Sequence, residues 1–210
     1  MKIIPMLLIA ALVTTGCTYN GKLKSGFYSP PNTAGKIPLK VNLICSDHFK
    51  STIIDPGHIY GGYAVRLKTD PTLQETLTTT FKSLFDDVFV DSAPDPSNQH
   101  GADIYLIPNL VMSGNILKFS LAVRNVASGE VIKQYEAQQN FKFGPPAGVR
   151  TLDSINIPFC GLLFPIVIPA NTSMIGHRGE KIFSEQMAAC VGQVADEIRY
   201  DASLLSRQRQ

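Results

Sequence analysis

Two segments of this chain repeat apolar residues at helical spacing, while others alternate apolar and polar residues as strands do. One helical stripe comprises Leu73, Leu77, Phe81, Leu84, Phe85 and Val88, and the other comprises Phe183, Met187, Cys190, Val191, Val194 and Ile198. Each helix has a single apolar face, so both are expected to pack on the same face of a sheet. The pattern predicts an α+β two-layer sandwich, with a mostly antiparallel sheet and two helices on one face.

Turn and capping residues place the other elements. Asp70 and Pro71 are typical of a helix start, and the last helix is expected from Arg178 to about Arg199. Ser128-Gly129-Glu130 joins two strands of a hairpin whose return strand runs from Val131 to about Phe143. Further strand candidates are Leu39 to Cys45, Phe49 to Ile54, Ile59 to Leu67, Val88 to Val90 and Ile104 to Leu110. Pro108 is expected to mark where pairing of its strand ends.

The N-terminal residues have the features of a secretory signal. Lys2 precedes an apolar run from Ile3 to Val13, and small residues follow up to Cys17. The run is too short to span a bilayer, which needs about 20 residues. We therefore expect export from the cytoplasm and removal of residues 1–16.

Gly16-Cys17 resembles the end of the bacterial lipobox, although Thr14 stands where that family usually has Leu. The resemblance implies that Cys17 is the lipidated residue and that acyl chains on it anchor the protein. Thr18, in place of the aspartate that retains lipoproteins in the inner membrane, implies the outer membrane, facing the periplasm. An ordinary signal peptide followed by a chance cysteine is the alternative.

The chain is expected to comprise four regions. Residues 1–16 form the signal peptide, 17–38 a lipidated N-terminus with a flexible tether rich in Gly and Pro, 39–202 one periplasmic α+β domain, and 203–210 a polar tail. The net charge of +2 and the absence of a basic, aromatic-rich stretch argue against a nucleic-acid partner.

Three cysteines remain after Cys17 is assigned to the lipid. An odd number in an oxidising compartment fits one disulfide and one buried thiol. Short separation favours Cys160 with Cys190 and leaves Cys45 as the thiol, whereas Cys45 with Cys190 is the rival pairing because both face inward.

The most apolar part of the mature chain, residues 155–170, contains Pro158, Pro165 and Pro169, which argue against a regular helix. It has three interpretations: a cover over the sheet, a surface that docks on a partner, or a membrane contact. We select the partner surface as the functional hypothesis. Its candidate partner-binding residues are Phe159, Leu162, Leu163, Phe164 and Ile166.

No catalytic or cofactor motif stands out in the sequence. The four histidines show no metal-ligand spacing, and Asp47 and His48, if in a strand, point to opposite faces. Gly176-His177-Arg178-Gly179 at the expected start of the last helix is more typical of a loop and cap than of an anion site. We therefore predict no enzyme activity, no metal and no cofactor.

The layout resembles the YajG family of small outer-membrane lipoproteins. The resemblance rests on Gly16-Cys17, the helix from Leu73 to Phe85 leading into a short strand, Ala102 to Leu106 at a strand start, and the final helix ending Val194 to Ile198. It implies a non-catalytic interaction module that is anchored to the membrane through Cys17 and binds an envelope assembly, secretion or transport complex. A carrier of an apolar ligand such as a lipid or glycolipid is the alternative.

Overall fold

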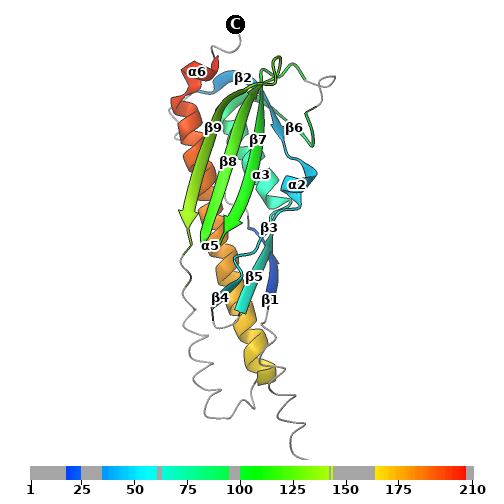
Figure 1. Cartoon of the computed structure of the whole chain (residues 1–210), viewed down its shortest axis with the longest axis vertical. Coiled ribbons are helices and arrows are strands. Elements are labelled where there is room, and N and C mark those ends of the chain that lie inside the picture. Colours follow the sequence, from blue (N-terminus) through cyan, green and yellow to red (C-terminus); the bar gives the residue numbers. More distant parts are fainter. Residues whose placement is uncertain are drawn as a thin grey trace, which may run out of the picture.

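The computed structural model describes residues 18–24, 35–60, 63–94, 100–141, 143 and 164–206, with the backbone alone for 58–60, 164–169, 204 and 206. Within them the chain forms two sheets and several helices, an α+β fold as predicted. The molecule is elongated, and its longest helix runs along most of its length (Figure 1).

The larger sheet has the strand order β6-β2-β7-β8-β9. Its strands are β2 (Ile37–Ile44), β6 (Phe85–Asp91), β7 (Ile104–Ser113), β8 (Ile116–Asn125) and β9 (Val131–Asn140). β2 is parallel to both β6 and β7, whereas β7, β8 and β9 are antiparallel. The sheet is therefore mixed rather than purely antiparallel, with most of its register pairs in the antiparallel part. The chain between β2 and β6 includes a helix, the crossover that parallel strands need.

The smaller sheet was not expected. In it, β1 (Thr18–Lys22) is parallel to β5 (Tyr63–Lys68), and β3 (Ile53–Ile54) and β4 (His58–Tyr60) are antiparallel to β5. Residues 18–22, predicted as part of a flexible tether, are thus a strand. Thr-Tyr-Asn-Gly-Lys has little strand patterning of its own, so its conformation depends on the partners it contacts.

Helix α3 (Thr72–Leu84) buries four residues of the predicted stripe, Leu73, Leu77, Phe81 and Leu84. Phe85 and Val88, predicted to continue the stripe, lie in strand β6. The helix begins slightly later than predicted, and the Leu73 amide donates to the Thr69 carbonyl at 2.8 Å. Asp86 and Asp87 follow the helix and lie exposed in β6.

Helix α5 (Phe164–Tyr200) starts 14 residues before the predicted Arg178. The inference that prolines exclude a helix from 155–170 is therefore wrong for residues 164–170. Pro165 is the second residue of α5, where backbone amides have no intrahelical acceptor in any case. Pro169 removes one donor early in a helix of 37 residues. The long packed remainder of the helix compensates for that loss.

Three shorter segments also differ from expectation. Phe49 was assigned to a strand but lies in α2 (Asp47–Lys50), where its amide donates to Oγ of Ser46 at 3.2 Å. The predicted polar tail starts inside α6 (Ala202–Ser206), and Leu205 is buried there. β7 pairs with β2 only up to Leu106, two residues before Pro108, yet continues along β8 past Pro108. The expectation for Pro108 thus holds for one neighbour and not the other.

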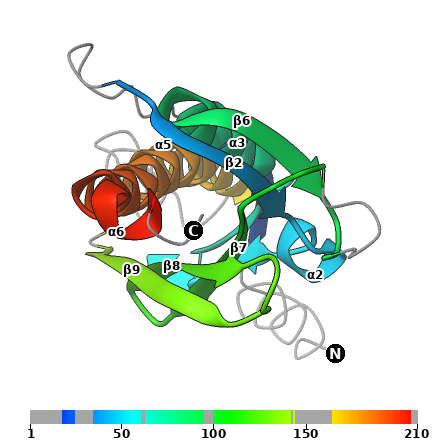
Figure 2. The same ribbon diagram turned by 90° about the horizontal axis from the view of Figure 1, so that it is seen from above.

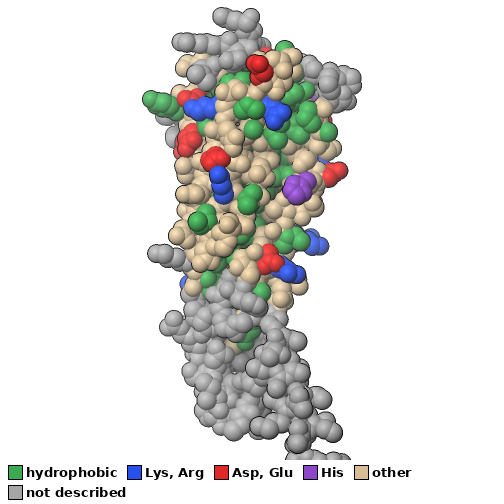
Figure 3. Space-filling model, viewed as in Figure 1, with side chains coloured by type: hydrophobic (Ala, Val, Ile, Leu, Met, Phe, Trp, Pro, Cys, Tyr) green, Lys and Arg blue, Asp and Glu red, His purple; other side chains and the backbone are tan. Residues whose placement is uncertain are grey.

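The core lies between the larger sheet and the helices. Seen from above, this sheet curves around α5 and α3, which both lie on its inner side (Figure 2). The predicted hairpin is confirmed: Phe119, Leu121 and Val123 on β8 are buried and pack in one cluster with Phe183 of α5. Gly129 in its turn has a φ of 71°, the left-handed region that favours glycine. On the face in Figure 3, charged side chains of both signs are interspersed.

Candidate functional site

Most residues of the predicted site lie outside the described part of the chain: Cys17, Phe159, Cys160, Leu162 and Leu163. Phe164 and Ile166 belong to the first turn of α5, for which the backbone is described. Thr18, the residue after Cys17, is the first residue of β1. The predicted anchor is therefore directly adjacent to a strand of the fold, so β1 and its contacts are the part of the structure that bears on anchoring.

A hydrogen-bonded cluster fastens β1 to α5. The Tyr19 hydroxyl donates to Oε1 of Glu180 at 2.7 Å and lies 3.4 Å from Nδ1 of His177. Nδ1 of His177 is 3.3 Å from Oε2 of Glu180, and the ammonium of Lys24 is 3.6 Å from the same oxygen. We call Tyr19, Lys24, His177 and Glu180 the β1–α5 clamp.

The clamp stabilises an ionised carboxylate in a largely buried position. The Glu180 side chain is only 9% exposed. Burial alone would raise the pKa of Glu180, but hydrogen bonds from Tyr19 and His177 and the charge of Lys24 lower it overall. Burial, together with the hydrogen bond to Glu180 and the charge of that carboxylate, raises the pKa of Tyr19 to about 12. At neutral pH the clamp therefore has a charged acceptor and a neutral phenol donor.

The same helix comes unusually close to β1 at two glycines. A Cβ on Gly176 would lie 2.1 Å from Cγ of Tyr19, and a Cβ on Gly21 would lie 2.4 Å from Oε1 of Glu180. Such distances are far below van der Waals contact, so both positions need glycine for this packing.

Beyond the clamp, β1 continues alongside α5 in the same direction. Tyr19 meets Gly176 and Glu180, and the Lys24 amide farther along donates to Oγ of Ser184 at 2.9 Å. The end of β1 next to Cys17 therefore points toward the N-terminal turns of α5. Sequence analysis missed this strand; the signal it contained was Tyr19 and Gly21 at a spacing of two.

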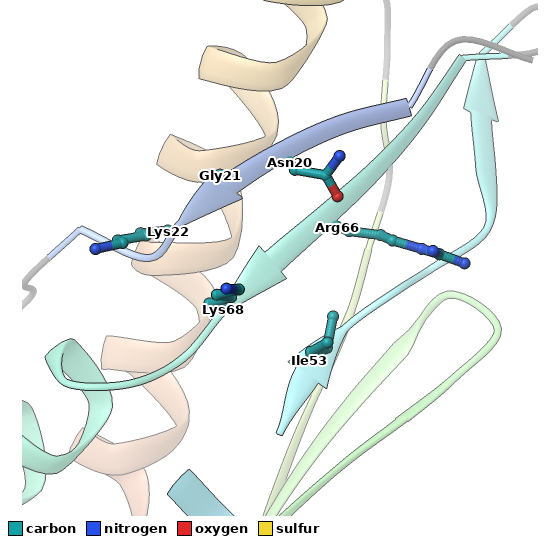
Figure 4. A pocket seen from close by; sticks show the side chains of 6 residues that line it. All are labelled: Asn20, Gly21, Lys22, Ile53, Arg66 and Lys68. Carbon is teal, nitrogen blue, oxygen red and sulfur yellow. The ribbon is translucent and has the colours of Figure 1, made fainter. Parts of the chain in front are cut away.

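The opposite face of the smaller sheet is basic. Lys22 pairs in register with Lys68, which pairs with Ile53, and Asn20 pairs with Arg66. These residues and Gly21 line an open cleft of about 330 Å³. In Figure 4 the Lys22 ammonium and the Arg66 guanidinium lie at opposite ends of this cleft. The Arg66 Nε is 2.6 Å from Oδ2 of Asp55.

Two of the cysteines are inside the core. Cys45 and Cys190 are fully buried, as their predicted inward positions require, and they are not bonded to each other, which argues against the rival pairing. Burial raises the pKa of both thiols to about 11. Cys160 lies outside the described residues, so its pairing with Cys190 stays a prediction.

The absence of catalytic and metal chemistry stays a prediction. Among the described residues no group of His, Cys, Asp and Glu is arranged to hold a metal ion. Asp47 and His48 lie in α2 rather than in a strand. Gly176 to Gly179 lie inside α5 and not at its start, which removes the helix N-terminus considered there. In the described part of the chain, no helix combines the length and apolarity needed to cross a membrane.

Comparison with known proteins yields remote structural similarity only. No family model and no curated protein matches the chain. A Xanthomonas campestris protein assigned to the family DUF330 has a TM-score of 0.48 and 8% identity, covering 91% of this chain and 97% of that one. Two PelC dodecamer structures from Paraburkholderia phytofirmans have TM-scores of 0.34 and 0.33 at 13% and 12% identity, covering 77% of this chain and 95% and 92% of theirs. No match confirms the YajG resemblance, which stays a prediction.

Proposed function

We propose that the protein is a lipoprotein of the outer membrane that faces the periplasm, is acylated on Cys17 and acts as a non-catalytic interaction module. Its partner would be an envelope assembly, secretion or transport complex, in line with the YajG-like layout. The observation that carries this proposal is that β1 begins at Thr18, one residue after the lipobox cysteine.

A lipid on Cys17 would hold the domain itself at the membrane rather than the end of a tether. Consecutive Cα atoms are about 3.8 Å apart, so Cys17 lies within one residue of β1. The strand is fixed by five register pairs with β5 and by the β1–α5 clamp. The height and orientation of the domain above the bilayer would then be set by the fold.

The start of α5 lies toward the same end. From Gly176, beside Tyr19, back to Phe164 the helix rises about 18 Å. Residues 154–176 include no charged side chain. Phe164 and Ile166, two of the candidate partner-binding residues, are therefore on a membrane-proximal segment, where a membrane-embedded partner would meet them.

Anchoring is tested by Cys17→Ser, with membrane fractionation and palmitate labelling as readouts. The variant is expected to leave the membrane fraction and to take up no label. Continued labelling and membrane association would refute lipidation at Cys17.

The interaction role is tested by inserting ten Gly and Ser residues between Cys17 and Thr18. The insertion keeps the lipid but frees the domain, so membrane association is expected to persist while recovery of co-purifying envelope proteins falls. The same insertion after Ser128, in the hairpin turn, is the control and is expected to change neither. Equal recovery of envelope proteins with both insertions would show that a fixed height of the domain above the bilayer is not needed for partner binding. Recovery of lipid or glycolipid without any protein would favour the carrier function.

A further inference from the structure

Two adjacent strands of the smaller sheet each carry an exposed lysine at the same register position. Lys22 and Lys68 are register partners on β1 and β5, and both are exposed. Within the part of the chain that the structure describes, no carboxylate lies within ion-pair distance of either ammonium. Like charges directly opposite each other destabilise a strand pair. An anion bound between the two ammonium groups would offset this repulsion.

The next row of the sheet adds a third cation. Arg66 lies opposite Asn20 and is held by Asp55 through the 2.6 Å contact. Counting Asp55, the face keeps an excess of two positive charges. We call Asn20, Lys22, Arg66 and Lys68 the basic face; it lines the cleft of about 330 Å³ with Ile53 at its edge (Figure 4).

The spacing of the two lysines suits a phosphate group. Neighbouring strands are about 4.8 Å apart, so Lys22 and Lys68 branch from adjacent backbone positions, and rotation of their long, exposed side chains would bring both ammonium groups to one phosphate. Lysine binds phosphate as a compact, flexible point charge. The basic face therefore matches a small anionic group rather than an extended acidic chain.

The location of the face determines which phosphate it meets. At about 3.3 Å per residue, Lys22 is roughly 17 Å along the chain from Cys17, and Asn20 roughly 10 Å. With Cys17 in a bilayer, both lie within reach of the headgroups around the anchor.

We propose that the basic face binds the phosphate of anionic lipid headgroups in the membrane that carries the protein. The inference rests on the proposed function, because the anchor is what brings the face to the lipids. Bound headgroups would orient the domain, with the lipid on Cys17 and the phosphates on the basic face as two separate attachments.

The test uses the mature chain carrying Cys17→Ser, so that binding does not depend on acylation. Its sedimentation with vesicles of phosphatidylcholine alone is compared with that of vesicles containing 30% phosphatidylglycerol at low ionic strength. Each lysine near an anionic surface contributes about fivefold in affinity, so K22Q/K68Q should bind the anionic vesicles about 30-fold more weakly. K36Q/K82Q, which removes two exposed lysines elsewhere, is the matched control and should bind like the parent.

Equal binding to both kinds of vesicle, or equal loss in the two double variants, would overturn the proposal. Inorganic phosphate at constant ionic strength distinguishes the source of the anion. If millimolar phosphate abolishes vesicle binding, the ligand is free phosphate and the headgroup assignment is wrong; persistence of binding supports it. A negative vesicle result leaves palmitate labelling of Cys17 unaffected, and absence of labelling leaves vesicle binding unaffected, so the two proposals fail separately.

Discussion

Replacing Gly176 by alanine tests the packing of β1 on α5 most directly. The new Cβ would lie 2.1 Å from Cγ of Tyr19 and within 2.4 Å of both Cδ atoms. Because Cγ is the root of the ring, rotation about χ2 cannot relieve the clash. A change of χ1 would break the Tyr19–Glu180 hydrogen bond, so either that bond is lost or β1 must move. Overpacking of this kind costs about 1–3 kcal/mol, and this contact belongs at the upper end. Alanine stabilises a helix by about 1 kcal/mol relative to glycine, so the free energy of unfolding should fall by about 1–2 kcal/mol in total.

Gly179→Ala is a matched control on the same helix. Its Cβ would lie 3.2 Å from Cγ1 of Val65, a tight contact that a shift of a few tenths of an ångström relieves. The helix propensity gain then dominates, and this variant should be equally stable or up to about 1 kcal/mol more stable. Denaturant unfolding measures the difference, which we expect to be about 2 kcal/mol. Hydrogen exchange should show faster exchange of the β1 amides in Gly176→Ala alone. Equal stability of the two variants, with β1 equally protected in both, would refute the close approach.

Two further predictions follow from the clamp and from the buried thiol of Cys45. Tyr19→Phe removes a hydrogen bond to a carboxylate and should cost about 1.5–3 kcal/mol in unfolding experiments at pH 7. Because the native pKa of Glu180 is lowered, the stability contributed by the hydrogen bond should be full above about pH 4.5 and should decline as the pH falls below that value. The native pKa of Tyr19 is about 12 against 10.0 in the unfolded chain, so the same contribution should also decline as the pH rises from 10 to 12. A cost that is the same at pH 3 and pH 7 would contradict the charged acceptor. Cys45 should resist alkylation by iodoacetamide in the native protein and react on unfolding, since burial excludes the reagent and raises its pKa to about 11. Native reaction as fast as that of the unfolded chain would contradict this prediction.

The parts of the fold that could be predicted are those whose own residues determine their environment. The stripe from Leu73 to Leu84 and the hairpin of Phe119, Leu121 and Val123 are periodic over enough residues to fix which face is buried. Both are buried as expected. Cys190 was likewise assigned to the core from its place in the last stripe, and it is fully buried.

The parts that could not be predicted depend on partners distant in sequence. β1 has five residues and contacts β5 and α5, so its conformation comes from residues more than 40 positions away. Parallel pairing of β2 with β6 and β7 leaves no local signal, because it depends on how the crossover is arranged. The start of α5 could not be predicted because Pro165 and Pro169 disfavour a helix at most positions. Both lie in the first two turns of α5, where proline is better tolerated.

The candidate site also has a part that the sequence predicts and a part that it does not. Cys17 is identified by its local motif, whereas the basic face needs the register of β1 and β5, since Lys22 and Lys68 are far apart in the chain. The β1–α5 clamp joins Tyr19 to Glu180, a contact between residues 161 positions apart. Chemistry that a single segment encodes is visible in the sequence, and chemistry shared between segments becomes visible with the topology.

The long helix contacts both sheets and thereby links the predicted anchor at Cys17 to the core. At about 1.5 Å per residue α5 extends roughly 55 Å. Its N-terminal half contacts β1 through Gly176 and Glu180, and its C-terminal half is buried against the larger sheet from Phe183 to Ile198. Force applied to a lipidated Cys17 would be transmitted through β1 and the β1–α5 clamp to the helix that packs in the core. Detaching β1 would therefore leave a lipidated Cys17 joined to the larger sheet only through the chain that follows β1. The domain would lose the stability that these contacts contribute, and its height above the bilayer would no longer be fixed.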